Sequence, residues 1–414
     1  MSVDTSAWLH TTYTATTSDI RGLILHTQAN YVVQDPSLKV ATITFRTDSE
    51  DVQRALRISE TTVGDATRVI KIDFSDELYG LQLARVQYIV DIALPTNTLS
   101  YLDASGDTVV GPRVLTNTTS SSIDVRVRGS GDVFLQDASL IADRLSFQIA
   151  GSGDLQVNIP STRAAAVEAL LTGSGDFSLF TASLDTKALD INTEASGTVF
   201  ISGSLEGNPT VTTRTFASGD ISYALTGSCT SHEITVTGSG DADTSSLACA
   251  STVVTATGSG DVYAAATTAF ASSKSGSGDV NFVGPTALKM TGKYHTQPYH
   301  QVPDEDADDV PPYVPATMYR GGSHSSQVVS DEATDGISLG AVVLLLILGY
   351  CFFRNCCKKR RQYEQLPMVV VVPSQQQQYN YQTYPPSYQS TAPVYTAPPQ
   401  LIVPPPQETY GKQP

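Results

Sequence analysis

The chain has 414 residues, which exceeds the ~100–150 residues of a typical single domain, so several segments or one elongated array are expected. Charged residues make up 16 % of it, against a usual ~25 %, and the formal net charge is −16. Basic residues cluster only at 354–361. The acidic remainder would repel a phosphate backbone, so the composition excludes a nucleic-acid-binding protein.

Residues 1–30 form an N-terminal segment that has neither the basic start nor the apolar run of a secretory signal peptide. The later parts of the chain nevertheless indicate an extracellular domain, which normally requires such a signal. We therefore expect a signal peptide to be missing from a truncated N-terminus. The alternative is that a later apolar helix translocates a long N-terminal tail.

A short repeat dominates the middle of the chain. The tetrapeptide Gly-Ser-Gly-Asp stands at 129–132, 151–154, 173–176, 238–241, 258–261 and 276–279. Degenerate copies at 104–107, 195–198 and 217–220 fill the gaps, so that successive copies are 18 to 25 residues apart. A period near 22 residues indicates a solenoid, in which each repeat buries the apolar face of its neighbours.

Apolar residues alternate around each copy, as at Ile123, Val125 and Val127, and Gly129 and Gly131 share their parity. A period of two is typical of a strand and excludes a helical repeat. Stacked coils of short strands predict an all-β fold, a parallel β-helix of about nine coils at ~4.8 Å per coil. The glycines are expected to let the chain bend at a corner and to adopt backbone angles barred to other residues.

The coil register places the aspartates of the repeat in one outward column, which Thr198 interrupts. Carboxylates ~4.8 Å apart repel by roughly 0.9 kcal/mol in bulk water. Two interpretations remain: each carboxylate accepts hydrogen bonds from backbone N–H and Ser hydroxyl groups, or the column binds Ca²⁺, the only cofactor we consider. The column contains Asp107, Asp132, Asp154, Asp176, Asp220, Asp241, Asp261 and Asp279, of which all but Asp107 and Asp220 are candidate calcium ligands.

The repeated Gly-Ser-Gly-Asp after an alternating strand resembles the head domain of the putative auto-transporter adhesins, a family named for bacterial surface proteins. The likeness covers about 31–285, because the stretches 39–45 and 69–74 resemble the strand pairs that precede the coils in that family. It implies a right-handed parallel β-helix over 98–285, preceded by an N-terminal β cap and the first coils at 31–97. It also implies an adhesin role, and it supplies no catalytic residues.

Two of the five cysteines, Cys229 and Cys249, occupy nearly equivalent places in successive repeats. Stacked coils would bring their Cα atoms close to the ~4.4–6.8 Å that a disulfide requires. We therefore expect a bridge formed in an oxidising compartment, the alternative being two free thiols. Asn117 begins the sequon Asn117-Thr118-Thr119 and is the candidate N-glycosylation site, with its occupancy left open.

Residues 286–335 are rich in proline and acidic residues, which predicts a semi-extended, disordered stalk. His295, His300 and His324 lie in it, match no zinc signature and are expected to be solvated. Residues 336–353 follow as an uncharged stretch of 18 residues. As a helix they would span about 27 Å of a ~30 Å hydrocarbon core, which predicts a single transmembrane helix rather than a buried core helix.

The cations that follow this stretch place the C-terminus in the cytosol and the N-terminus outside the cell or in a lumen, on the plasma membrane or an endomembrane. Residues 354–414 form a Pro-, Gln- and Tyr-rich tail, which is expected to be disordered. The candidate palmitoylation sites, with plain reduced thiols as the alternative, are Cys351, Cys356 and Cys357.

Two short motifs in the tail predict trafficking. Tyr363 and Leu366 form a tyrosine-based endocytic motif. Pro385, Pro386 and Tyr388 form a PPxY motif, which resembles the ligand of WW domains and predicts a cytosolic WW-domain partner. The alternative is a low-complexity tail without specific partners.

Together these segments predict a cell-surface adhesion or recognition protein, which binds an extracellular glycan or protein and is not an enzyme. A β-helical carbohydrate-active enzyme is the alternative, because glycoside chemistry uses paired carboxylates. Such a pair needs two unlike environments, whereas these carboxylates repeat in every coil. A passive structural or coat protein, which would have no ligand, is the third interpretation.

Overall fold

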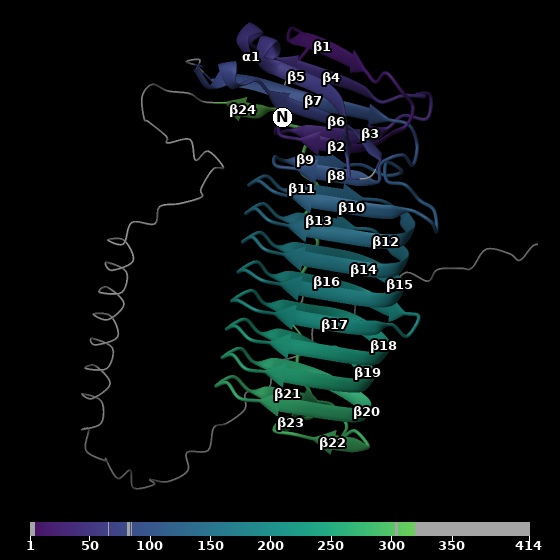
Figure 1. The fold of residues 1–414 in the computed structure, drawn as a ribbon, viewed down its shortest axis with the longest axis vertical. Coiled ribbons are helices and arrows are strands. Elements are labelled where there is room, and N and C mark those ends of the chain that lie inside the picture. Colours follow the sequence, from purple (N-terminus) through teal and green to yellow (C-terminus); the bar gives the residue numbers. More distant parts are fainter. Residues whose placement is uncertain (1–4, 65, 81–82, 84, 303–304, 319–414) are drawn as a thin grey trace, which may run out of the picture. The chain divides into compact units, whose positions relative to one another are not determined.

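A computed structural model describes residues 5–64, 66–80, 83, 85–302 and 305–318 (Figure 1). The described residues form 24 strands in one hydrogen-bonded sheet system that winds into a parallel β-solenoid of about nine coils. The sequence prediction of an all-β parallel β-helix is therefore confirmed.

Five antiparallel or mixed strands and one short helix form a cap at the N-terminal end of the coils. The strands are β1 (Leu9–Thr14), β4 (Thr42–Thr47), β5 (Leu56–Val63), β6 (Thr67–Phe74) and β7 (Val86–Leu94). The helix α1 (Glu50–Ala55) begins after Ser49, whose hydroxyl accepts a hydrogen bond from the Val52 N–H at 3.4 Å. A 3₁₀ helix, η1 (Asp76–Gly80), precedes β7.

Two long parallel ladders form the walls of the solenoid, one on each side of the Gly-Ser-Gly-Asp turn. The ladder before the turn contains β2 (Ile20–Leu25), β8 (Tyr101–Ala104), β10 (Ser122–Val127), β12 (Ser139–Ile149), β14 (Ser161–Leu171), the later part of β15 (Phe177–Thr193), β17 (Thr210–Thr215), the later parts of β18 (Ile221–Val236), β19 (Ala242–Ala256) and β20 (Val262–Lys274), and β22 (Lys289–Thr291). Parallel β6–β2 pairing joins this ladder to the cap.

The ladder after the turn begins with β3 (Asn30–Gln34), β9 (Thr108–Val110), β11 (Val133–Gln136) and β13 (Leu155–Asn158). It continues through the first part of β15, β16 (Val199–Glu206), the first parts of β18, β19 and β20, β21 (Val280–Val283) and β23 (His295–Gln297). The parallel register is continuous, so equivalent residues of successive repeats lie one above the other.

The predicted inward positions fill the interior of the coils. In β10, Ile123, Val125 and Val127 are buried and alternate with partly exposed polar residues. Phe147 lies above Val125 in the same ladder, and its ring contacts that of Phe177 from the other ladder, with centroids 5.1 Å apart. The buried alternation explains why the sequence period is two, since only one face of each strand meets the core.

The prediction of a free stalk is wrong for the part of 286–335 that the structure describes. β22 and β23 form the last coil, and β24 (Ala316–Met318) pairs antiparallel with β7 in the N-terminal cap (Figure 1). Residues 298–302 and 305–318, hereafter the return segment, therefore run back along the solenoid to the N-terminal cap. The predicted N-terminal boundary also differs, because β1 and β2 lie within residues 1–30.

The predicted transmembrane stretch 336–353 and the tail 354–414 lie outside the described residues. Within the described part of the chain, no helix has the length and apolar character needed to cross a membrane.

Candidate functional site

The Gly-Ser-Gly-Asp turn joins two ladder strands and is bonded to the equivalent turn of the preceding coil. The Ser152 and Gly153 N–H groups both donate to the carbonyl oxygen of Gly129, at 2.9 and 3.1 Å. The same pattern recurs near the other end, where Ser277 and Gly278 donate to Gly258 at 3.1 and 3.4 Å. Each turn is therefore a docking surface for the next one.

The glycines of this turn are required by close stacking. A Cβ atom at Gly151 would lie 1.9 Å from the carbonyl oxygen of Gly129, and one at Gly153 would lie 2.1 Å from that of Gly131. None of these glycines has a positive φ, so the expectation of backbone angles barred to other residues is wrong. Small size, and not conformational freedom, is what the repeat selects.

The aspartates of the turns form a hydrogen-bonded column, hereafter the Asp ladder. In each link, Oδ1 of one aspartate accepts the backbone N–H of the residue that occupies the same place in the next coil, at 2.6 to 3.1 Å. The accepting residues are Asp107, Asp132, Asp154, Asp176, Asp220, Asp241 and Asp261. This geometry supports the structural interpretation of the column.

Thr198 breaks the Asp ladder as the sequence predicts. Its N–H donates to Asp176 at 2.6 Å, but no described hydrogen bond runs from Asp220 back to it. Burial, followed by neighbouring carboxylates, raises the pKa of Asp154 and Asp241, although the backbone N–H of the next coil opposes the shift. In the last Gly-Ser-Gly-Asp turn a hydrogen bond from Lys274 instead lowers the pKa of Asp279.

A small acidic cavity lies beside the Asp ladder, where the return segment crosses it. It has a volume of about 200 Å³ and is lined by Asp132, Asp154, Asp176, Glu305 and Asp308, together with Phe134, Leu155, Gln156, Ser178, Thr198 and Phe200. The Gln156 amide holds the return segment there through the backbone N–H and carbonyl of Asp308, at 3.0 and 2.9 Å. Burial and the nearby carboxylates raise the pKa of Glu305.

Within the described residues, no three His, Cys, Asp or Glu side chains are grouped in a way that could hold a metal ion. Each linked carboxylate of the Asp ladder also uses one oxygen for the next coil. Calcium binding by Asp132, Asp154, Asp176, Asp241, Asp261 and Asp279 stays a prediction.

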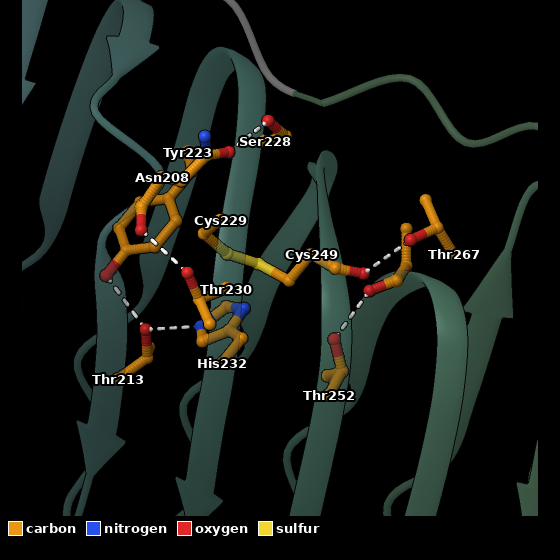
Figure 2. The surroundings of a disulfide bond; sticks show 11 residues. Asn208, Thr213, Tyr223, Ser228, Cys229, Thr230, His232, Cys249, Thr252 and Thr267 are labelled. Atoms are coloured by element: carbon orange, nitrogen blue, oxygen red, sulfur yellow. Dashed lines mark hydrogen bonds between the residues drawn. A yellow bond between two sulfur atoms is a disulfide. The ribbon is translucent and has the colours of Figure 1, made fainter.

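Cys229 and Cys249 face each other in β18 and β19 and are joined by a disulfide, with their Cα atoms 4.3 Å apart (Figure 2). Side chains around the bridge bond to neighbouring coils: the Thr230 hydroxyl donates to the Asn208 carbonyl at 2.8 Å, and the Thr267 hydroxyl donates to the Cys249 carbonyl at 3.3 Å. The bridge therefore lies within a cross-linked region of the wall.

A buried polar group that the sequence did not indicate lies near the disulfide (Figure 2). The Thr213 hydroxyl is 2.8 Å from the Tyr223 hydroxyl and 2.9 Å from Nε2 of His232. Within the described residues, Nδ1 of His232 has no hydrogen-bond partner. Complete burial lowers the pKa of His232 to about 3, so the imidazole is neutral in the folded protein at physiological pH.

The side chain of Asn117 is engaged by the next coil. Its Nδ2 donates to the Ser139 carbonyl at 3.1 Å, and its Oδ1 accepts the Ile141 N–H at 2.8 Å. Glycosylation of Asn117 stays a prediction, in which a glycan would be attached to an amide that already bridges two coils.

The predicted sites of the tail lie outside the described residues. They are the candidate palmitoylation sites Cys351, Cys356 and Cys357, the endocytic residues Tyr363 and Leu366, and the WW-binding residues Pro385, Pro386 and Tyr388.

Sequence reasoning also missed how the return segment is attached. His300 is not solvated as expected: its ring stacks on Tyr263, with centroids 3.8 Å apart, and its Nε2 lies 2.8 Å from Asp243 Oδ2. At the cap, the Tyr31 hydroxyl accepts the Val314 N–H at 2.9 Å. These partners are far apart in sequence, so no local pattern signals them.

The fold and its stacked turns define the class of the protein, a capped parallel β-solenoid. Residues 209–285 match the family model "Putative auto-transporter adhesin, head GIN domain", which confirms the resemblance inferred from the repeat. A comparison with curated proteins finds no match.

Three solved structures of bacterial proteins are among those that match this chain. A putative adhesin from Parabacteroides merdae is 18 % identical, with 70 % of this chain and 97 % of that chain covered and a TM-score of 0.42. A putative adhesin from Parabacteroides distasonis is 16 % identical, with coverages of 69 % and 97 % and a TM-score of 0.37. A putative lipid binding protein from the same species is 14 % identical, with coverages of 70 % and 96 % and a TM-score of 0.36.

Proposed function

We propose that this chain is a surface-exposed adhesion or recognition protein whose solenoid presents the binding surface to an extracellular glycan or protein. The observation that carries the proposal is the match of residues 209–285 to an adhesin head domain. The stacked turns support it, because they make the solenoid a stiff scaffold whose repeated motif serves architecture.

The proposed topology is single-pass, with residues 336–353 crossing a plasma membrane or endomembrane and residues 354–414 in the cytosol. The disulfide between Cys229 and Cys249 supports an extracellular or lumenal solenoid, because such bonds persist in oxidising compartments. In this arrangement the tail binds a WW-domain protein through Pro385, Pro386 and Tyr388.

The proposed role is non-enzymatic. The acid and the base of a glycosidase need two unlike environments. Most carboxylates of the Asp ladder instead have the same environment, because each accepts a hydrogen bond from a backbone N–H of the next coil. This uniformity favours a structural role for the Asp ladder over catalysis and over dedicated calcium binding.

Host cells that produce the full chain, and matched cells that lack it, test the proposal on an array of glycans and extracellular-matrix proteins, with and without millimolar calcium. Chain-dependent attachment is the expected result. Protease added to intact cells should remove the solenoid and leave the tail. Equal attachment by both cell lines, or a solenoid protected from the protease, would contradict recognition at the surface.

A further inference from the structure

The last coil lacks the turn that every earlier coil stacks upon. Between the paired residues Ala271 and Asn281 the chain makes a full turn of nine residues, whereas three residues connect their partners Thr291 and His295. The Gly-Ser-Gly-Asp turn at 276–279 therefore overhangs, with no equivalent turn on its outer side. Ser272 fixes the shortened connection, because its hydroxyl donates to the Lys293 carbonyl at 2.8 Å.

A pocket of about 770 Å³ lies under this overhang, hereafter the end pocket. Its lining includes Lys274, Ser275, Gly276, Lys293, Tyr294 and His295. The Gly276 carbonyl corresponds to those of Gly238 and Gly258, which accept N–H groups of the following turn. No described backbone N–H donates to it, so it is a free acceptor at the pocket.

The end pocket is basic in a strongly acidic protein. Residues 215–302 contain six acidic residues and only three lysines or arginines, namely Lys274, Lys289 and Lys293. All three fall in the last twenty-nine residues of that stretch, and Lys293 and His295 are exposed. Asp279, whose place has no counterpart in the last coil, pairs with Lys274 and lies 3.6 Å from His295. No described acidic side chain forms an ion pair with Lys293.

We propose that the end pocket binds the acidic end of a saccharide, with Lys293 facing its carboxylate or sulfate group. This inference rests on the recognition function proposed above and assigns its ligand class and location. The Gly276 carbonyl and the Ser275 and Thr296 hydroxyls suit sugar hydroxyl groups. Tyr294 supplies an apolar wall, fixed by edge-on packing against Phe270 at a centroid distance of 5.5 Å.

Charge and position both favour a short acidic end over a long polyanion. A polyanion that continued along the solenoid would run beside Asp261 and Asp241 of the Asp ladder, which would repel it. The return segment ends in the N-terminal cap, where β24 pairs with β7, so the described chain leaves the solenoid at the opposite end from the end pocket (Figure 1). The end of the described chain therefore lies away from the end pocket.

Binding of the full-length chain, solubilised in detergent, to immobilised sugars tests the inference. Sialyl-lactose is compared with lactose, and sulfated N-acetylglucosamine with its neutral parent, so that carboxylate and sulfate are distinguished. We expect about tenfold tighter binding to at least one acidic sugar, and about tenfold weaker binding after Lys293→Glu. The matched control is Lys187→Glu, the same charge change at an exposed lysine in a middle coil, which should bind as wild type.

Three results would overturn the assignment of the end pocket: equal binding to acidic and neutral sugars, binding that survives Lys293→Glu, or equal losses in both variants. Higher salt should weaken the acidic-sugar binding, since the contact is exposed. Cell attachment that persists with Lys293→Glu would reject the end pocket and keep the recognition function. Absence of attachment with the wild-type chain would instead reject the recognition function itself.

Discussion

The middle coils and the last coil, which is formed by β22 and β23, belong to the same two parallel ladders and differ in one turn. In the middle, the Gly153 N–H donates to the turn of the preceding coil, and the Asp154 carboxylate accepts the Asp176 N–H from the next. In the last Gly-Ser-Gly-Asp turn, which the last coil does not cover with a turn of its own, Asp279 has no such N–H to accept and binds Lys274 instead. The comparison shows that the repeated motif serves to stack coils, and that a free polar surface appears where stacking stops.

The same comparison explains where function-bearing groups can lie. Backbone and carboxylate groups of the middle turns form hydrogen bonds with neighbouring coils. Because these bonds repeat from coil to coil, the middle turns present few polar groups that are specific to one coil. The end pocket collects groups released from that use, together with Lys274 and Lys293, two of the three lysines and arginines in residues 215–302.

The largest expected effect comes from the covalent link between two middle coils. Cys249→Ser removes the bridge to Cys229, which closes a loop with a sequence separation of 20 residues. We expect a loss of about 3 kcal/mol in the free energy of unfolding, because the unfolded chain gains freedom. Denaturant unfolding of the variant measures it. Wild type under reducing conditions should show the same loss, and a variant as stable as oxidised wild type would contradict the prediction.

Stacking of the middle turns is tested by adding one methyl group. Gly153→Ala would place a Cβ 2.1 Å from the Gly131 carbonyl, so the coils must separate, at an expected cost of about 2 kcal/mol. The matched control is Gly111→Ala, whose Cβ would lie 3.4 Å from its nearest neighbour, the Val32 carbonyl. Thermal unfolding should show a clearly larger decrease in Tm for Gly153→Ala. Equal decreases would mean that turn stacking is looser than the structure indicates.

Buried His232 predicts a loss of stability in acid. Its pKa is about 3 in the folded protein and near 6.5 when exposed, so the unfolded chain takes up the proton more readily. Its contribution to stability is therefore complete above pH 6.5 and falls as the pH is lowered towards 3, by roughly 2 kcal/mol at pH 5.

His232→Leu should remove this slope from a plot of unfolding free energy against pH. The control is His10→Leu at an exposed histidine, which should keep it. An unchanged slope in His232→Leu would assign the acid sensitivity to other groups.

Much of the solenoid could be predicted because its signals are local and repeated. The parity of Ile123, Val125 and Val127 gives the buried face, and the spacing of Cys229 and Cys249 gives their place on stacked coils. The Asp ladder followed from the same register. The hydrogen-bond partner of each carboxylate could not be predicted, because a backbone N–H one coil away has no sequence signature.

The return segment and the end pocket could not be predicted in this way. Proline and acidic residues at 298–318 indicate an unpacked chain, whereas Gln156, Tyr31 and Tyr263 hold parts of the segment through contacts remote in sequence. The end pocket depends on a missing turn, which a repeat search does not report. Only the grouping of Lys274, Lys289 and Lys293 could have drawn attention to it.

The smallest expected effect compares single links of the Asp ladder. Asp154→Ala removes the acceptor of the Asp176 N–H, which is 2.8 Å away, and should cost about 1 kcal/mol. Asp154→Asn keeps an oxygen acceptor without the charge. Because burial raises the pKa of Asp154, the folded state binds its proton more tightly, and ionisation at neutral pH opposes folding.

Asp154→Asn should therefore match or exceed wild type in Tm at pH 7, and this advantage should vanish below the ordinary carboxyl pKa of 3.8. The matched change in the last Gly-Ser-Gly-Asp turn, Asp279→Asn, should instead lower Tm at pH 7, because Lys274 loses its partner and the pKa of Asp279 is lowered in the folded state. Thermal unfolding at pH 7 and at a pH below 3.8 measures the change in Tm for both variants. Changes of the same sign would show that the two aspartates share one environment, against the contrast between stacked and terminal turns.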